Sequence, residues 1–172
     1  FDPNAGTSFT PQGIFTACER HEYKIIELLS ISKRTDLNVR DLKGRTLLQI
    51  AIIENDKKLF DILLNAYETL RKVNLNLQTR ILTDKNNFIA GVQLDKTPLM
   101  LCVEYKRWDF FDRLIDIDDV DIEICDLNHD TITMILAQKY DGLTYLKRLY
   151  EKKKEAFLRT LNIKNLTMKT PL

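Results

Sequence analysis

Glycine and proline are scarce in this sequence, with 5 Gly and 4 Pro among 172 residues. Such a composition leaves little material for glycine-rich phosphate-binding loops or for long disordered linkers. The sequence also lacks a Walker A motif, the pattern G-x-G-x-x-G, the pattern G-x-S-x-G and a kinase signature. No motif therefore points to nucleotide binding or to these enzyme classes.

Cysteine and histidine are also few. The three cysteines (Cys18, Cys102 and Cys125) are an odd number at wide spacing, unlike the disulfide framework of a small secreted protein. No C-x-x-C or H-x-x-x-H pattern is present, so the sequence predicts neither a metal site nor a cofactor. The cysteine usage favours a reducing, intracellular compartment.

Neither sign of charge dominates, and long apolar runs are missing. Lys+Arg 26 against Asp+Glu 25 gives a net charge of +1, which provides no electrostatic reason to bind nucleic acid over the whole surface. No apolar run reaches the ~18 residues that a membrane span needs, and the first residues do not resemble a signal peptide. The sequence begins without Met and stops at "KTPL", so we expect a fragment of a longer protein, cytoplasmic, with the nucleus left open.

What the sequence has instead is an internal repeat. Four segments align: "PQGIFTACERHEYKIIELLS" (11–30), "RTLLQIAIIENDKKLFDILL" (45–64), "KTPLMLCVEYKRWDFFDRLI" (96–115) and "DTITMILAQKYDGLTYLKRLY" (130–150). Ala17 and Ala51 match at a spacing of 34, as do Thr97 and Thr131, and a fifth copy starts at Thr170. Each copy contains two apolar patterns of helical period, separated by a polar break, which predicts a pair of short helices. His21 and Asn55 share one position of the break, where a tight turn favours a left-handed residue.

A second pattern lies between the copies. The segments "LNVRDLKGRT" (37–46), "IEICDLNHDT" (122–131) and "LNIKNLTMKT" (161–170) alternate in hydrophobicity and place Asp or Asn five residues before Thr. This pattern predicts a short extended arm and a β-turn, with Gly44 at a position of positive φ. The Thr then caps the next helix, and Pro98 or Pro171 occupies its first turn.

Together these features resemble the ankyrin repeat, a unit of about 33 residues with a T-P-L-H-x-A signature. The signature is matched by "TLLQIA" at 46–51 and "TPLMLC" at 97–102, and more loosely by "TITMIL" at 131–136. The resemblance implies an all-α ankyrin-repeat solenoid of about four to five helix-turn-helix repeats with short β-turn fingers. It implies one domain over 1–172, with repeats at 9–40, 41–75, 92–125 and 126–160 and the start of another at 161–172.

The pattern is interrupted twice. Thr46 and Thr97 lie 51 residues apart, so we expect a second helix from Lys57 to about Val73 and then an insertion at about 76–95, between repeats 2 and 3. The D-x-x-G turn is missing before Thr97, so the third repeat is expected to lack a regular finger. The longer step to Thr170 predicts one long outer helix through "YLKRLYEKKKEAFLRTL".

Several conspicuous residues have structural interpretations. We expect Cys18 and Cys102 to be packed core thiols, and the acidic stretch 116–126 to be a solvated junction between repeats. The basic stretch 147–159 is expected to be the solvated face of an outer helix; contact with nucleic acid or lipid is the alternative that we do not favour. Trp108 is expected to pack at the start of a second helix, with an interface anchor as the alternative.

Ankyrin-repeat domains are, as a family, protein-interaction modules, so the resemblance implies a non-catalytic module that binds a protein or peptide and no small-molecule substrate. The alternative is a regulatory domain, autoinhibitory or positioning, of an attached enzyme. As a fragment the chain is expected to be monomeric. The expected partner-binding residues lie on the fingers, on exposed positions of the first helices, at the start of one second helix and on the insertion: Arg40, Leu42, Lys43, Arg45, Gln49, Met100, Glu104, Trp108, Leu127, Asn128, His129, Phe88 and Ile89.

Overall fold

The computed structural model describes residues 11–80 and 95–171, which form helices and connecting segments. The helices are α1 (Pro11–Glu19), α2 (Tyr23–Ile31), α3 (Leu47–Glu54), α4 (Lys57–Leu70), α5 (Pro98–Glu104), α6 (Trp108–Ile115), α7 (Ile132–Ala137), α8 (Gly142–Lys152) and α9 (Lys154–Thr160). Within these two ranges the extended pairing is limited to an isolated antiparallel bridge between Arg40 and Thr46. The predicted all-α class is confirmed.

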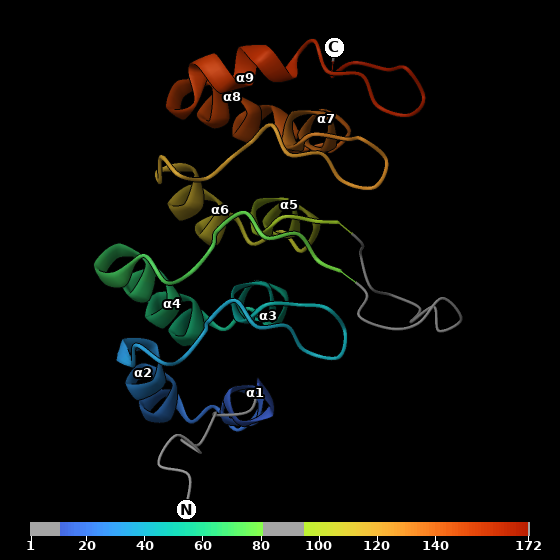
Figure 1. Cartoon of the computed structure of the whole chain (residues 1–172). Coiled ribbons are helices and arrows are strands. Elements are labelled where there is room, and N and C mark those ends of the chain that lie inside the picture. Colours follow the sequence, from blue (N-terminus) through green and yellow to red (C-terminus); the bar gives the residue numbers. More distant parts are fainter. Residues whose placement is uncertain (1–10, 81–94, 172) are drawn as a thin grey trace, which may run out of the picture.

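The helices stand in two rows (Figure 1). The inner helices α1, α3, α5 and α7 form one row, and the outer helices α2, α4, α6 and α8 form the other. Extended loops project from the side of the inner helices, away from the outer ones. We call these loops finger 1 (37–46), finger 2 (75–80 and 95–97), finger 3 (122–131) and finger 4 (161–170).

The core lies between the two rows and runs the length of the stack. Inner helices contribute small side chains such as Ala51 and Cys102, both fully buried, so that the rows can approach closely. The outer helices α4, α6 and α8 each place a fully buried leucine at the equivalent position: Leu63, Leu114 and Leu149. Each helix pair therefore completes its core with its neighbours, as expected for a solenoid.

The cysteine thiols of the inner helices belong to this core, which confirms the expectation for Cys18 and Cys102. Burial, reinforced by the carboxylate of Asp56, raises the pKa of Cys18 to about 12. Burial also raises the pKa of the Cys102 thiol well above its ordinary value. Both side chains therefore stay protonated near neutral pH and act as small apolar groups.

The ends of the inner helices follow the expected local rules with one exception. The hydroxyls of Thr46 and Thr97 accept the amide N–H three residues on, as N-caps do. Thr131 makes no such cap, because its hydroxyl lies 2.6 Å from that of Thr133. At the other end of these helices His21 and Asn55 adopt φ values of 54° and 59°, as predicted for the tight turn.

Cations from one repeat cap helices of the preceding one. Arg107 donates to the carbonyls of Ile52 and Ile53 at the end of α3. The Lys153 amine donates at 2.5 Å and 2.9 Å to two carbonyls just beyond α6, those of Ile117 and Asp118. Carbonyls near a helix end have few intrahelical partners, so these cations add donors there, although the carbonyls of Ile52 and Ile117 also accept a backbone N–H.

The inward turn of Lys153 corrects the expectation of one long outer helix. The chain breaks at Lys153, where φ is −128° and ψ is 41°, and continues as the separate helix α9. These angles lie outside the helical region, and they let the amine reach the preceding repeat. Burial lowers the pKa of the Lys153 amine, as expected where a cation loses part of its hydration.

Neighbouring outer helices are joined by aromatic stacking and by ion pairs. Phe60 of α4 stacks on Phe110 of α6, and Trp108 of α6 stacks on Tyr145 of α8 with ring centroids 3.7 Å apart. The packing interpretation of Trp108 is therefore confirmed. Ion pairs bridge the same two interfaces: Asp61 with Arg113, Asp112 with Arg148, Lys57 with Asp109, and Lys152 with Asp116.

Candidate partner-binding surface

The tips of fingers 1, 3 and 4 share one turn geometry. In each, a side-chain oxygen accepts the amide N–H groups two and four residues on. The acceptors are Asp41, Asp126 and Asn165. Because the acid or amide side chain folds back onto the turn, the next residue points away from the finger into solvent.

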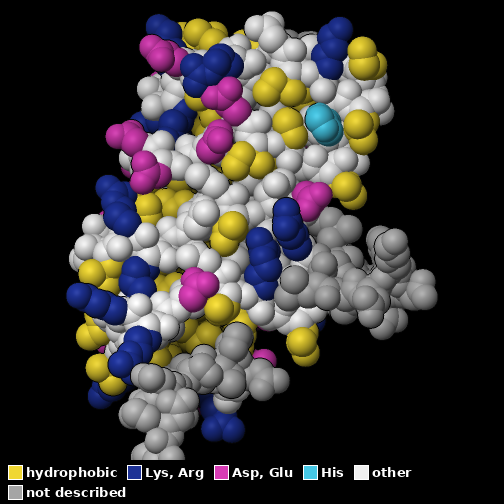
Figure 2. All heavy atoms as spheres, viewed as in Figure 1, with side chains coloured by type: hydrophobic (Ala, Val, Ile, Leu, Met, Phe, Trp, Pro, Cys, Tyr) yellow, Lys and Arg dark blue, Asp and Glu magenta, His cyan; other side chains and the backbone are white. Residues whose placement is uncertain are grey.

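That next residue is a leucine in all three fingers. Leu42 is 84% exposed, Leu127 57% and Leu166 68%, and Met168 at the tip of finger 4 is 70% exposed. Apolar side chains accordingly appear along the finger edge of the molecule (Figure 2). A leucine that is exposed at the same position of three fingers does not contribute to the core. Rows of exposed apolar side chains mark interaction surfaces.

The charged residues of finger 1 divide into free and engaged ones. Lys43 is exposed, whereas the Arg45 guanidinium pairs with the Asp41 carboxylate at 2.6 Å and is largely buried. Arg40 donates to the carbonyl of Gly44. Burial lowers the pKa of Arg40, and the nearby charge of Arg80 lowers it further. Lys43 is therefore the cation of this finger that is available to a partner.

A groove of ≈ 580 Å³ separates finger 1 from α1. Phe15 and Leu42 provide apolar surface on its two sides, and Lys43 and Glu19 add opposite charges. Such a combination of apolar walls and few polar groups suits the side chain of a bound protein segment.

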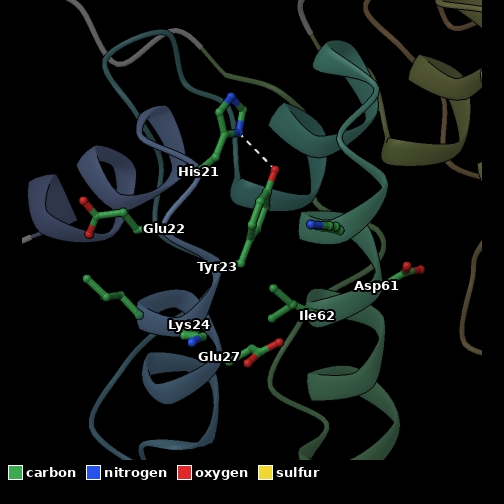
Figure 3. Close-up of a pocket in the computed structure, with 9 residues that line it drawn as sticks. His21, Glu22, Tyr23, Lys24, Glu27, Asp61 and Ile62 are labelled. Atoms are coloured by element: carbon green, nitrogen blue, oxygen red, sulfur yellow. Dashed lines mark hydrogen bonds between the residues drawn. The ribbon is translucent and has the colours of Figure 1, made fainter.

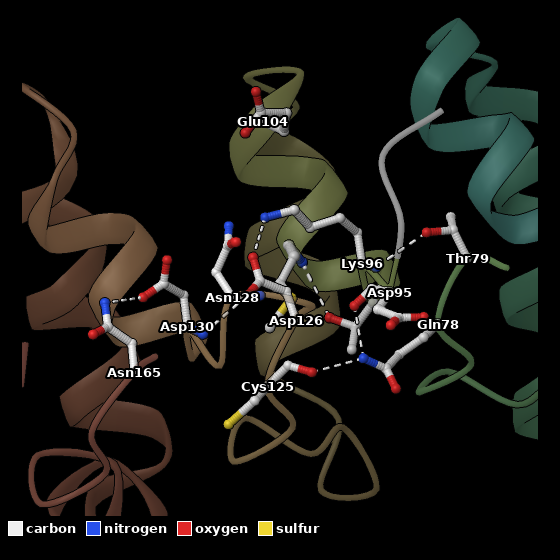
Figure 4. Close-up of polar contacts among 12 residues, drawn as sticks. Gln78, Thr79, Asp95, Lys96, Glu104, Cys125, Asp126, Asn128, Asp130 and Asn165 are labelled. Carbon is white, nitrogen blue, oxygen red and sulfur yellow. Dashed lines mark hydrogen bonds and ion pairs between the residues drawn. The ribbon is translucent and has the colours of Figure 1, made fainter. Parts of the chain in front are cut away.

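A buried ion pair joins fingers 2 and 3 (Figure 4). The Lys96 amine lies 2.5 Å from the Asp126 carboxylate, and the Asp126 side chain is only 1% exposed. The Gln78 amide donates at 2.7 Å to the carbonyl of Cys125, a second link between the same fingers. Asn165 of finger 4 donates in turn to Asp130 of finger 3. The fingers are thus cross-linked into one continuous edge.

Finger 2 keeps the regular pairing at its base. The Thr79 N–H donates to the Lys96 carbonyl at 2.9 Å, as Asp41 N–H does to Arg45 in finger 1, and Asp95 adopts a φ of 57°. The expectation that the third repeat lacks a regular finger is therefore wrong at the base, and residues 76–80 form its arm. Residues 81–94 of the predicted insertion, with Phe88 and Ile89, lie outside the described residues.

Comparison with known proteins agrees with this geometry. A family model described as "Ankyrin repeats (3 copies)" matches residues 14–124. The chain belongs to the ankyrin-repeat family. A search of curated proteins found no match.

One solved neighbour with a similar fold is a chain of the structure entitled "Bd0816 Predatory Endopeptidase from Bdellovibrio bacteriovorus in complex with immunity protein Bd3460". The identity is 19%, the alignment covers 92% of this chain and 87% of that one, and the TM-score is 0.52. At this identity the likeness shows the fold alone.

Two residues expected at the surface of the ankyrin stack are buried. Gln49 is 0% exposed and Met100 1%, so the expectation that these first-helix positions are exposed is wrong. The Gln49 amide closes a capping box with Thr46 and donates at 2.6 Å to the carbonyl of Leu77. Finger 2 therefore covers this position, and Gln49 ties one ankyrin repeat to the next.

The other expected residues divide by exposure. Leu42, Lys43, Leu127, Asn128 and His129 are exposed on the fingers. Glu104 is half-buried, with its carboxylate 3.7 Å from the Lys139 amine, and Trp108 lies among the outer helices, away from the fingers (Figure 1). The structure thus brings the finger residues together and leaves Trp108 apart from them. Leu166, Met168 and Phe15 were missed, although the Leu after Asp41, Asp126 and Asn165 was a visible signal.

Residues 11–80 and 95–171 contain neither a metal-binding cluster nor a membrane-spanning helix. In that part of the chain no three His, Cys, Asp or Glu side chains are grouped so that they could hold a metal ion. Within the same ranges no helix is both long and apolar enough to cross a membrane.

Proposed function

We propose that this ankyrin-repeat chain is a non-catalytic protein-interaction module that binds a protein or peptide along its finger edge. Ankyrin repeats are protein-interaction modules, and the observation that supports this surface is the exposed leucine repeated on three fingers, Leu42, Leu127 and Leu166. The Asp or Asn side chain beneath each leucine is hydrogen-bonded within its turn and fixes the tip in place, so little conformational entropy is lost when a partner binds.

The proposed setting is an intracellular, cytoplasmic scaffold or recruitment domain within a larger protein. The basic stretch 147–159 supports a protein partner over nucleic acid or lipid, because Arg148, Lys152 and Arg159 each pair with an acid of the preceding repeat. Charges neutralised in this way contribute little to phosphate binding.

The test compares variants of the finger tips in an affinity capture. We expect Leu42→Asp combined with Leu127→Asp to lower the affinity for a captured partner about tenfold or more, since each change replaces an exposed apolar anchor by a charge. Leu143→Asp combined with Leu158→Asp is the matched control, because both leucines are exposed on α8 and α9, away from the fingers.

Binding of each purified partner is then measured by calorimetry. Thermal melting should stay within a few degrees for both double variants, because all four side chains are exposed. Since the solved neighbour comes from a complex that contains an endopeptidase, enzymes belong among the partners tested. Equal affinity of all variants for every partner would contradict binding at the finger tips.

A further inference from the structure

The surface opposite the fingers contains a second hollow region, between α2 and α4 (Figure 3). Two adjoining hollows of ≈ 790 Å³ and ≈ 810 Å³ follow one another along the two helices and share four lining residues. The shared residues are Lys24, Glu27, Asp61 and Ile62. We call this the α2–α4 groove.

The groove exposes an apolar stripe on α2. Ile25 is 41% exposed, and Leu28 and Ile31 are each 66% exposed, and all three line the groove. By the 34-residue repeat, Ile25 and Leu28 match Leu59 and Ile62 of α4, which are 1% and 9% exposed. The same positions are thus buried in the next repeat and exposed here.

The two neighbouring interfaces show what normally closes such a groove. Between α4 and α6, Asp61 pairs with Arg113, and between α6 and α8, Asp112 pairs with Arg148. The arginine in each case reaches back across the surface from the later helix to the earlier one. The Arg113 guanidinium also lies 5.0 Å from the centre of the Phe60 ring, so it covers apolar surface.

The α2–α4 interface has the acid but not the arginine. Glu27 stands at the position of Asp61, and Ile62 stands at the position of Arg113. Among the residues that the structure describes, the exposed Glu27 carboxylate has no ion-pair or hydrogen-bond partner. The groove is therefore left open, with the apolar stripe of α2 along it and the unpaired Glu27 beside that stripe, while Lys24 and Lys58 also line it.

We propose that the α2–α4 groove binds an amphipathic helix of a partner protein, with a basic residue of that helix paired to Glu27. A helix suits the groove because outer helices already pack side by side along this surface, and its apolar face would cover Ile25, Leu28 and Ile31. The basic residue would take the role that Arg113 and Arg148 have in the other two interfaces. This site is separate from the finger edge and does not depend on it.

The test selects helices from a phage-displayed library built on a 20-residue helical scaffold, with the 172-residue chain as bait. We expect enriched helices to contain apolar residues spaced three or four apart and an Arg or Lys. Affinity of a synthetic enriched helix is measured by fluorescence anisotropy. Leu28→Asp combined with Ile31→Asp should weaken binding at least about tenfold, because two exposed apolar contacts are lost.

Two further variants make the test specific. Ile62→Arg should place the missing arginine opposite Glu27, close the groove and abolish binding. Because Ile62 is only 9% exposed, this change is expected to lower the melting temperature, so binding is compared at a temperature at which circular dichroism shows the variant folded. Glu27→Arg should weaken the binding of a helix that contains Arg about tenfold. It should strengthen the binding of the same helix when Glu replaces that Arg. Leu42→Asp combined with Leu127→Asp is the control that should leave helix binding unchanged.

The proposal is wrong if no helix is enriched, or if enriched helices bind the Leu28→Asp, Ile31→Asp variant with unchanged affinity. Sedimentation velocity and flotation with anionic vesicles are run on the same chains. Dimerisation or vesicle binding that disappears with Leu28→Asp would assign the stripe to a second copy or to a membrane and would overturn the partner helix. If the finger-tip variants left partner binding unchanged, the proposal for the fingers would fail, but the helix-binding result at the α2–α4 groove would still stand.

Discussion

Asp126→Ala is expected to destabilise the domain by about 3–5 kcal/mol, because it removes one member of a buried charge pair. The Asp126 carboxylate accepts the Lys96 amine at 2.5 Å and the N–H groups of Asn128 and Asp130 at 2.8 Å and 2.9 Å. Alanine would leave Lys96, whose side chain is 16% exposed, without its counter-charge and would leave the turn without its acceptor. The measurement is urea unfolding followed by circular dichroism.

Matched variants separate the charge from the turn. Asp126→Asn keeps an oxygen acceptor for the turn, so the stability that this variant loses should come mainly from the unpaired Lys96 amine. Adding Lys96→Met to Asp126→Asn removes the unpaired cation and should recover part of that loss. Asp109→Ala removes a pair in which both side chains are more than half exposed, and its effect should be under about 0.5 kcal/mol.

Amide hydrogen exchange provides the local readout. Loss of protection should concentrate at Asn128 and Asp130 in finger 3, because their N–H groups lose the acceptor. A loss of less than about 1 kcal/mol for Asp126→Ala would show that the pair contributes no more than a surface pair does.

Features that depend on neighbours in the sequence could be predicted. Thr46 and Thr97 cap their helices, and His21 and Asn55 take left-handed angles, because these preferences are set within a few residues. The alternating arms likewise indicated the fingers. The finger-tip leucines could have been found in the same way, since each follows the Asp or Asn of its turn.

Features that depend on the next repeat could not be predicted. Gln49 has a polar side chain and a helical position that suggest exposure, yet its amide reaches the carbonyl of Leu77, 28 residues away. The break at Lys153 likewise arises from carbonyls of the preceding repeat. In both cases the residue is fixed by a backbone group that only the stacking of repeats brings near.

The arm of finger 2 was missed for a different reason. Its sequence "LNLQT" (75–79) matches "LNVRD" (37–41), but the D-x-x-G turn that follows this arm in finger 1 is missing before Thr97. In the structure the two sides of this finger are separated by residues 81–94, and Thr79 takes the place of the turn Asp. A comparison of arms instead of turns would have found it.

Gly44→Ala is expected to destabilise the domain by about 2–4 kcal/mol, and the cause is contact more than backbone strain. Gly44 has a φ of +72°, which fits its predicted role in the turn. At the equivalent positions, however, Asp95, His129 and Met168 adopt φ values of 57°, 60° and 61° with full side chains. Left-handed backbone alone therefore does not require glycine in these fingers.

The distinguishing feature of Gly44 is finger 2, which lies directly against it. A Cβ on Gly44 would lie 1.0 Å from the carbonyl oxygen of Arg80, and the Arg80 N–H donates to the Gly44 carbonyl at 3.1 Å. Any side chain would push the two fingers apart and break this hydrogen bond. The loss should add to the roughly 1 kcal/mol that a non-glycine residue pays for positive φ.

Gly44→Asn decides between the two causes. Asparagine tolerates positive φ better than alanine does, but it has the same Cβ, so we expect both variants to lose similar stability. His129→Gly is the matched control at an exposed tip and should change the free energy of unfolding by less than about 1 kcal/mol. Near-normal stability of Gly44→Asn, with the Arg80 amide still protected from exchange, would assign the glycine to backbone strain instead.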